Sequence, residues 1–114
     1  MARKKELSPE ALDLIAARFR VLAEPMRLRI LHTLGRSEMT VGDLVDATGA
    51  GQANTSKHLG ILLDAGIVAR RKEGLNAFYR VADDSIFELC DAVCVSLADR
   101  LAAQHGTITS FAGR

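Results

Sequence analysis

The sequence predicts a mainly helical domain with one two-stranded β-ribbon, in which four helices precede the ribbon and one follows it. Three observations carry this prediction. Apolar residues recur every three or four positions along most of the chain. Turn signals containing Gly or Pro separate these stretches. Residues 67–81 have the composition of two short strands around Gly74.

The length of 114 residues indicates a single domain. We expect residues 1–7 to form a basic flexible arm, residues 8–105 the folded domain and residues 106–114 a flexible tail. No apolar run is long enough to cross a membrane, and no signal-peptide core follows the basic N-terminus. The sequence therefore predicts a cytoplasmic protein without membrane contact.

The first predicted helix begins at Ser8-Pro9, where Ser suits the N-cap and Pro the first helical position. Pro25 opens a second helix, which Gly35 ends. Arg27 is expected to face out from this second helix, where it could meet a phosphate. The first helix carries an apolar stripe made of Leu12, Ile15, Ala16, Phe19 and Leu22.

Two further helices are predicted around a glycine-containing turn. Thr40 and Asp43 have capping-box spacing, and Gly49 supplies a stop signal. The next helix begins near Gln52 and ends at Gly66. At 100° per residue, one face of it holds Thr55, Leu59, Leu62 and Leu63, and the other holds Ala53, Asn54, Ser56, Lys57 and Gly60. This arrangement is typical of a helix-turn-helix whose second helix enters a DNA major groove.

The polar face supplies the candidate base-contacting residues. Gln and Asn side chains can bond adenine edges, and Lys can reach guanine or phosphate. We therefore assign the major-groove role to Gln52, Asn54, Ser56 and Lys57. His58 lies on the flank of this helix, where packing or a phosphate contact outweighs metal binding.

The ribbon carries a cluster of cations, namely Arg70, Arg71, Lys72 and Arg80. Beside a helix-turn-helix, such a cluster indicates a wing that grips the DNA backbone or minor groove. The alternative is a solvated charged edge that protects the strands from aggregation. The net charge is only +1, but residues 51–82 hold five cations against two anions, whereas residues 83–105 hold five anions against one cation. This asymmetry favours a basic recognition region beside a separate acidic element, although charge scatter in short windows is an alternative.

The last helix is predicted from the acidic cap at residues 83–85. Its apolar stripe runs for about four turns through Ile86, Leu89, Cys90, Val93, Cys94, Leu97 and Leu101. Too little of the domain remains to cover this stripe. We therefore expect the first and last helices to pack against a second copy, giving a homodimer that reads an inverted-repeat operator in successive major grooves about 34 Å apart.

These segments together resemble the winged helix-turn-helix repressors of the ArsR/SmtB type. The resemblance is carried by Glu-Pro-Met-Arg-Leu-Arg-Ile-Leu at 24–31, by residues 52–63, by Ala-Gly-Ile-Val at 65–68 and by Phe-Tyr-Arg at 78–80, and it spans roughly residues 10–105. It implies a dimeric, DNA-binding transcriptional repressor that responds to an effector.

Cys90 and Cys94 are the chemically distinctive residues, because a spacing of four puts both on one helical face. Soft thiolates suit arsenite and thiophilic metal ions, but free cysteines are also ordinary buried hydrophobes. The resemblance implies metal sites of two other kinds, which this chain does not match. Residues 41–48 contain no Cys, and the last helix has no His before His105. Cys90 and Cys94 thus remain the only candidates for metal binding or redox sensing.

No obligatory cofactor is expected, and arsenite or a thiophilic metal ion is a possible effector. Two thiols from one chain leave zinc short of four ligands, and a disulfide within an intact helix is poorly aimed. No catalytic constellation stands out, so we do not expect an enzyme. The sequence predicts a repressor that a metal, metalloid or thiol-reactive signal at Cys90 and Cys94 releases from DNA. The alternatives are a DNA-binding regulator with structural cysteines and another effector or none, and a winged-helix protein-interaction module.

Overall fold

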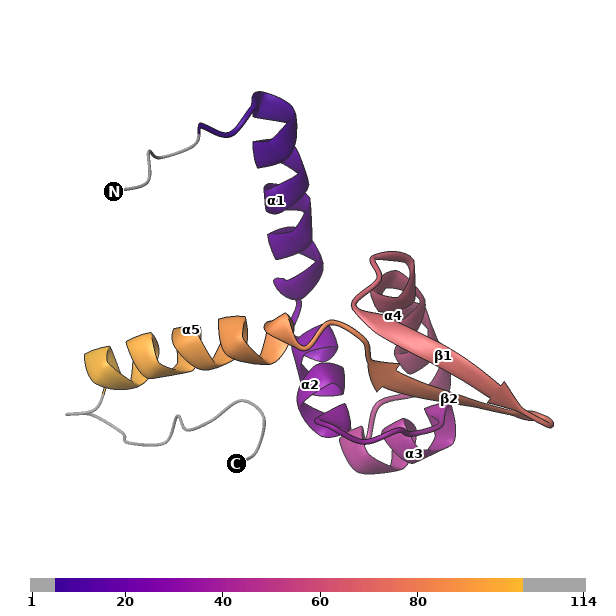
Figure 1. Cartoon of the computed structure of the whole chain (residues 1–114). Coiled ribbons are helices and arrows are strands. Elements are labelled where there is room, and N and C mark those ends of the chain that lie inside the picture. Colours follow the sequence, from indigo (N-terminus) through magenta and orange to yellow (C-terminus); the bar gives the residue numbers. More distant parts are fainter. Residues whose placement is uncertain (1–5, 102–114) are drawn as a thin grey trace.

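The computed structural model describes residues 6–101, and within them the predicted order of four helices, two strands and a final helix is confirmed (Figure 1). The elements are α1 (Pro9–Leu22), α2 (Pro25–Leu34), α3 (Val41–Thr48), α4 (Gln52–Asp64), β1 (Val68–Glu73), β2 (Asn76–Val81) and α5 (Ser85–Leu101). Most of the expected arm, the expected tail and His105 lie outside the described residues. Within the described part, no helix is long and apolar enough to span a membrane.

The helix ends form where the local chemistry predicts them. The Ser8 hydroxyl accepts a hydrogen bond from the Ala11 N–H at 3.1 Å, which caps α1. Both bonds of the capping box between Thr40 and Asp43 are present at the start of α3. Gly49 ends α3 with a φ of 75°, in the left-handed region that favours glycine. The end of α3 at Gly49 leaves a short turn before α4 begins at Gln52.

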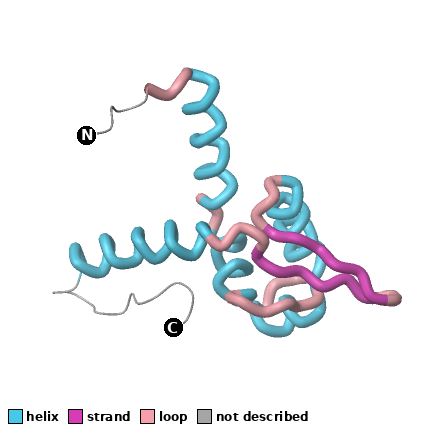
Figure 2. The backbone as a smooth tube through the Cα atoms, in the orientation of Figure 1, coloured by secondary structure: helices cyan, strands magenta, loops and turns pink. Residues whose placement is uncertain are grey.

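The core lies where α2, α3 and α4 meet the base of the ribbon and the first turn of α5 (Figure 2). Its fully buried side chains are Ile30, Leu31, Leu34, Leu44, Thr55, Leu59, Leu62, Ile67 and Phe87. Phe87 was not part of the predicted stripe, yet it is 1% exposed, and the Arg36 guanidinium lies 4.3 Å from the centre of its ring. The start of α5 therefore belongs to the core.

The ribbon is antiparallel, and its register runs from Val68 opposite Val81 to Glu73 opposite Asn76. A third segment also pairs with it through a single bridge. The backbone N–H groups of Met39 and Tyr79 each donate to the other residue's carbonyl, at 3.0 and 2.8 Å. This bridge ties the ribbon to the loop between α2 and α3.

Two helices extend away from the core, α1 and α5, and they project in different directions (Figure 1). Much of the apolar stripe predicted for each is exposed, including Leu12 (53%), Phe19 (51%) and Val93 (50%). The radius of gyration is 16.2 Å, against about 13 Å for a compact chain of this length. One chain alone thus leaves a large apolar surface uncovered.

Candidate nucleic-acid interface and thiol groove

Helix α4 has the two faces that its sequence predicts. Thr55, Leu59 and Leu62 are at most 1% exposed, and the Thr55 hydroxyl donates to the Gly51 carbonyl at 2.9 Å. The opposite side is open to solvent, and it carries Gln52, Asn54, Ser56 and Lys57. The four candidate major-groove residues therefore lie on the exposed surface of one helix.

His58 lies apart from that exposed set. Its side chain is 8% exposed, and its Nδ1 atom is 3.1 Å from Nη1 of Arg27. The structure thus shows that His58 packs within the domain, and its contact with a phosphate stays a prediction. Arg27 also differs from the expectation that it faces out, because its Nε donates to the Val21 carbonyl at 2.6 Å.

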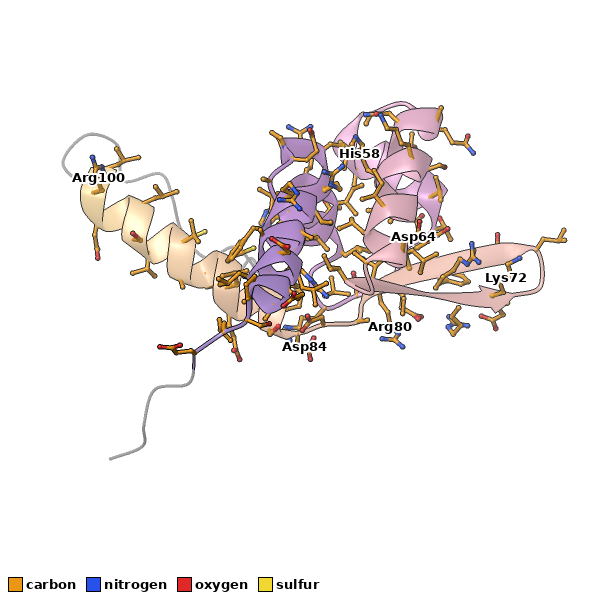
Figure 3. All side chains as sticks on the ribbon, turned by 90° about the horizontal axis from the view of Figure 1, so that it is seen from above. His58, Asp64, Lys72, Arg80, Asp84 and Arg100 are labelled. Carbon is orange, nitrogen blue, oxygen red and sulfur yellow. The ribbon has the colours of Figure 1, made fainter. Side chains whose placement is uncertain are left out.

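The wing cations divide between the two faces of the ribbon. Residues opposite one another in the register share a face, and neighbours along a strand alternate. Arg70 and Lys72 accordingly lie on the face whose base packs into the core, and Arg71 and Arg80 lie on the other. Figure 3 shows Lys72 near the tip of the ribbon and Arg80 nearer its base. Sequence alone grouped these four cations as one patch.

Arg71 is already engaged within the chain. Its guanidinium contacts the Glu38 carboxylate at 2.8 and 3.2 Å and the Glu73 carboxylate at 2.9 Å, and it lies 4.8 Å from the centre of the Phe78 ring. The hydrogen bond from Arg71 lowers the pKa of Glu38, and the two carboxylates raise the pKa of Arg71. Arg70, Lys72 and Arg80 have no such ion pair among the contacts of the described residues.

A groove of about 450 Å³ opens between α1 and α5, and its walls are almost wholly apolar. The side chains that line it are Phe19, Leu22, Ala23, Leu28, Leu89, Cys90, Val93, Cys94 and Leu97. Both cysteines are free and half-buried. Burial raises the pKa of the Cys90 thiol, and Cys94 and Asp91 add to that effect. Two soft donors thus face one apolar groove.

Within residues 6–101, no cluster of three or more His, Cys, Asp or Glu side chains could hold a metal ion. Cys90 and Cys94 therefore have no third His, Cys, Asp or Glu ligand within the described part of one chain. Further ligands would have to come from a second copy, from a small thiol or from outside this part.

Sequence reasoning missed the two arginines that join α1 to the rest of the domain, Arg18 and Arg27. Arg18 donates to the Ala65 carbonyl at 3.2 Å and lies 3.5 Å from the Asp83 carboxylate. A basic residue just beyond the end of a helix is a signal for carbonyl capping, and Arg27 follows the end of α1 by five positions. No local signal identifies Ala65 as the partner of Arg18.

Residues 24–70 match the family model described as "Bacterial regulatory protein, arsR family". This segment runs from the N-cap of α2 into β1, and so it includes the helix-turn-helix. The chain is also 36% identical over 91 residues to a probable mercury resistance operon repressor from Streptomyces lividans, covering 80% of this chain and 73% of that protein.

Two solved structures share the fold. The homodimeric winged helix-turn-helix DNA-binding domain of Mb0332 from Mycobacterium bovis has a TM-score of 0.75 and 31% identity, covering 92% of this chain and 97% of that one. The antimony-specific transcriptional repressor AntR has a TM-score of 0.74 and 26% identity, covering 91% of this chain and 94% of that one. Both likenesses extend beyond the helix-turn-helix to nearly the whole chain.

Proposed function

Because the chain belongs to the arsR family of bacterial regulatory proteins, we propose that it represses transcription as a homodimer whose grip on an inverted-repeat operator is released through Cys90 and Cys94. Its membership makes it a transcriptional repressor with a DNA-binding winged helix, and not an enzyme. The partner copy, the operator form, the residue roles and the signal are our proposals.

The observation that carries the proposal is that one chain leaves two unlike surfaces open. Polar side chains cover the exposed side of α4, and an apolar, thiol-bearing groove lies between α1 and α5. The ribbon and α5 point in opposite directions from α2, so these surfaces are well separated (Figures 1 and 3). Separate surfaces suit separate partners, namely DNA and a second copy of the chain.

In the DNA complex, Gln52, Asn54, Ser56 and Lys57 contact bases and phosphates in the major groove. We assign phosphate contacts to Arg70 and Lys72, which lie on the core-facing side of the ribbon, with Lys72 nearer its tip. Arg80 and Arg71 lie on the other side, and Arg71 must exchange Glu38 or Glu73 for phosphate to take part. His58 contributes through packing.

The dimer forms through α1 and α5. Exposed Phe19 and Leu97 line the groove from these two helices, and Leu12 and Ile15 continue the apolar surface along α1. A monomer rarely leaves contiguous apolar patches of this kind uncovered. The M. bovis domain, whose structure is homodimeric and covers 92% of this chain, supports a homodimer here.

The signal is a thiophilic metal or metalloid ion, or an oxidant. Cys90 and Cys94 share one helical face and one groove, and both lie within the proposed dimer surface. The likeness to a mercury resistance repressor and to an antimony-specific repressor supports a soft, thiol-binding effector such as mercuric ion, antimonite or arsenite. No obligatory cofactor is needed for DNA binding under this proposal.

Release follows from the position of the thiols between the two copies. An ion bound by Cys90 and Cys94, with ligands from the partner copy, changes how the α1 and α5 helices of the two copies pack together and hence the spacing of the two α4 helices. A coupling of about 1–3 kcal/mol, which is usual for such linkage, weakens operator binding roughly 5- to 150-fold. Oxidation acts at the same interface between the two copies, which we call the dimer seam. A disulfide between Cys90 and Cys94, four positions apart, distorts an intact helix.

One observation favours the alternative that the cysteines only pack. Burial raises the pKa of Cys90, which lowers the fraction of reactive thiolate at neutral pH. In that case the protein is still a DNA-binding repressor of the same family, but its effector binds elsewhere. The two hypotheses differ in whether cysteine substitutions abolish the response.

The test measures the affinity for duplex DNA selected from a random library with the reduced wild-type protein. The measurement is repeated after oxidation and after addition of mercuric ion, antimonite, arsenite or zinc. The same titrations are run on Cys90→Ser, Cys94→Ser and the double variant. Because the chain has two cysteines, the double variant contains no thiol and serves as the matched control.

We expect at least one treatment to weaken binding by 5-fold or more in the wild type, and the double variant to ignore that treatment. An equal response in the wild type and the thiol-free variant contradicts thiol sensing. Absence of any salt-dependent affinity for duplex DNA contradicts the proposal as a whole.

A further inference from the structure

The Arg27 side chain joins three parts of the molecule. It leaves the first turn of α2, and its Nε donates to the Val21 carbonyl at 2.6 Å, while Nη2 lies 3.5 Å from the Arg20 carbonyl. Both acceptors belong to the last turn of α1, where the Arg20 carbonyl also accepts a hydrogen bond from the N–H of the C-cap residue Ala23 at 3.3 Å. The third nitrogen, Nη1, lies 3.1 Å from Nδ1 of His58 in α4. One guanidinium thus contacts both the end of α1 and α4, the proposed DNA-recognition helix.

The chemistry of these groups makes the contact with His58 directional. A guanidinium carries only donors, so Nδ1 of His58 must be the acceptor. This hydrogen bond requires the imidazole tautomer that carries its proton on Nε2. The imidazole is 8% exposed, and packing holds it in place. A lysine in place of Arg27 could not make these three contacts, because its ammonium is a single point on a flexible stem.

Arg18 provides a second link between the same two helices. It projects from α1, and its Nη2 donates at 3.2 Å to the carbonyl of Ala65, the C-cap residue of α4. Its Nη1 lies 3.5 Å from the Asp83 carboxylate, which in turn accepts a hydrogen bond from the Ser85 N–H at the start of α5. Arg18 therefore connects α1 with the end of α4 and with the beginning of α5.

These links matter because α1 carries the apolar surface that the proposed dimer covers. Phe19 lies between Arg18 and Arg20 in sequence, and it is 51% exposed and lines the groove with the cysteines. A shift of α1 at the dimer seam moves the Arg20 and Val21 carbonyls and the Arg18 side chain together. The two carbonyls are linked to α4 through Arg27 and His58. Arg18 is bonded directly to the Ala65 carbonyl at the end of α4.

We propose that Arg27, acting through His58, and Arg18, acting through the Ala65 carbonyl, are positioning residues. They fix the position of the recognition helix relative to the proposed dimer interface. This inference rests on the proposed function and adds the route by which the state of the seam reaches DNA. The polar face of α4 makes the DNA contacts, and the two arginines set where that face lies.

A direct phosphate contact by Arg27 is the competing hypothesis, and the geometry opposes it. All three guanidinium nitrogens are directed to partners within the chain, and the side chain is half-buried. The hypotheses predict different salt dependence. Loss of a phosphate contact reduces the slope of log affinity against log salt by about one, whereas loss of a positioning contact leaves the slope unchanged.

The experiment compares Arg27→Gln, His58→Leu, His58→Asn and the double variant Arg27→Gln/His58→Leu in the full chain. The Asn side chain keeps an acceptor near the position of Nδ1, whereas Leu fills space without one. Arg18→Gln tests the second link with a half-exposed side chain. Each variant is first checked for its dimer mass and melting temperature. Affinity for the wild-type-selected duplex is then measured over a range of salt concentrations.

We expect Arg27→Gln and His58→Leu each to weaken binding about 10-fold with an unchanged salt slope. The double variant should be no weaker than Arg27→Gln alone, because Arg27→Gln already removes the contact with His58. His58→Asn should restore most of the affinity, and Arg18→Gln should weaken binding about 3-fold. If Arg27→Gln does not fold, the contrast between His58→Leu and His58→Asn decides the question alone.

Several outcomes overturn this inference. They are a lower salt slope in Arg27→Gln, additive losses in the double variant, equal affinities of His58→Asn and His58→Leu, and unaltered binding in all variants. A failure of the proposed function is distinguishable, because the wild-type protein would then show no salt-steep affinity for any duplex.

Discussion

The Arg71 guanidinium lies 2.8 Å from the Glu38 carboxylate, although the two residues are 33 positions apart in the sequence. Glu38 stands in the loop before α3, and Arg71 stands in the middle of β1. Together with the Met39 to Tyr79 bridge, this ion pair holds the ribbon against the loop. If the wing contacts DNA phosphates as proposed, Glu38 competes with those phosphates for Arg71.

Replacing the Glu38 carboxylate with an amide should therefore strengthen DNA binding. We expect Glu38→Gln to raise the affinity for duplex DNA by about 2- to 5-fold at low salt, with the gain fading as salt screens it. Glu73→Gln is the matched comparison, because Glu73 also contacts Arg71 but its side chain is 69% exposed, against 33% for Glu38. Glu73→Gln should therefore raise the affinity for duplex DNA less than Glu38→Gln does. Weaker binding by Glu38→Gln in an anisotropy titration would instead assign Glu38 the role of holding the wing in shape.

Asp83 links the stability of the domain to acidity. Hydrogen bonds from the Ser85 side chain and N–H, together with the nearby Arg18, lower the pKa of Asp83. A carboxyl whose pKa is lower in the folded state contributes stability above its unfolded value of about 4, and it loses that contribution as the pH falls through the folded value. Asp83→Asn should thus melt roughly 2–5 °C below the wild type at neutral pH, with the gap narrowing as the pH falls below the unfolded value. A gap that stays constant in thermal melts over this pH range would rule out the charge as the cause.

The exposed apolar face of α1 predicts the oligomeric state. Phe19→Asp places a charge in the proposed seam and should raise the dimer dissociation constant more than about 100-fold, because burying an unpaired carboxylate is costly. Leu75→Asp is the control, since Leu75 is equally apolar and fully exposed but lies in the ribbon turn. Sedimentation should give a monomer for Phe19→Asp and a dimer for Leu75→Asp. If both variants sediment as dimers, the dimer interface does not include Phe19.

The thiol groove predicts how slowly Cys90 reacts. Burial raises the pKa of this thiol, and Cys94 and Asp91 add to the effect, so little thiolate is present at neutral pH. In Cys94→Ser, which leaves Cys90 as the single thiol, iodoacetamide should react about 10-fold more slowly with folded than with urea-unfolded protein at neutral pH. The rate should still be rising at about pH 9. Equal rates in the two states would show that Cys90 is neither buried nor shifted.

The local signals in the sequence were sufficient for the helices and for the exposed side of α4. Caps such as Ser8 and the pair Thr40 and Asp43 act within one turn, and the period of 3.6 separates Thr55 and Leu59 from the polar side. The apolar stripes of α1 and α5 were equally readable. These features depend on neighbours in sequence, and so their chemistry is visible there.

The contacts that shape the candidate site depend on residues far apart in sequence. The helical period predicts that Arg27 faces out, because it does not show that the carbonyls ending α1 and His58 lie within reach of its guanidinium. Likewise, the run of cations in the ribbon indicates a wing but not its register, which puts Arg71 on the face opposite Arg70. No periodic pattern in the sequence predicts the bridge between Met39 and Tyr79. Such pairings follow from packing, and a single sequence does not contain them.

The most direct test of the central claim is the sequence that the reduced wild-type protein selects from a random duplex library, read together with the selection made by Asn54→Ala. We predict an inverted repeat with half-sites one helical turn, about 34 Å, apart. The Asn54→Ala protein should bind the same repeat with relaxed preference at one position per half-site, at a cost of about 1–3 kcal/mol. Enrichment of no sequence, or of a single half-site without a partner, would contradict a dimeric repressor that reads DNA through α4.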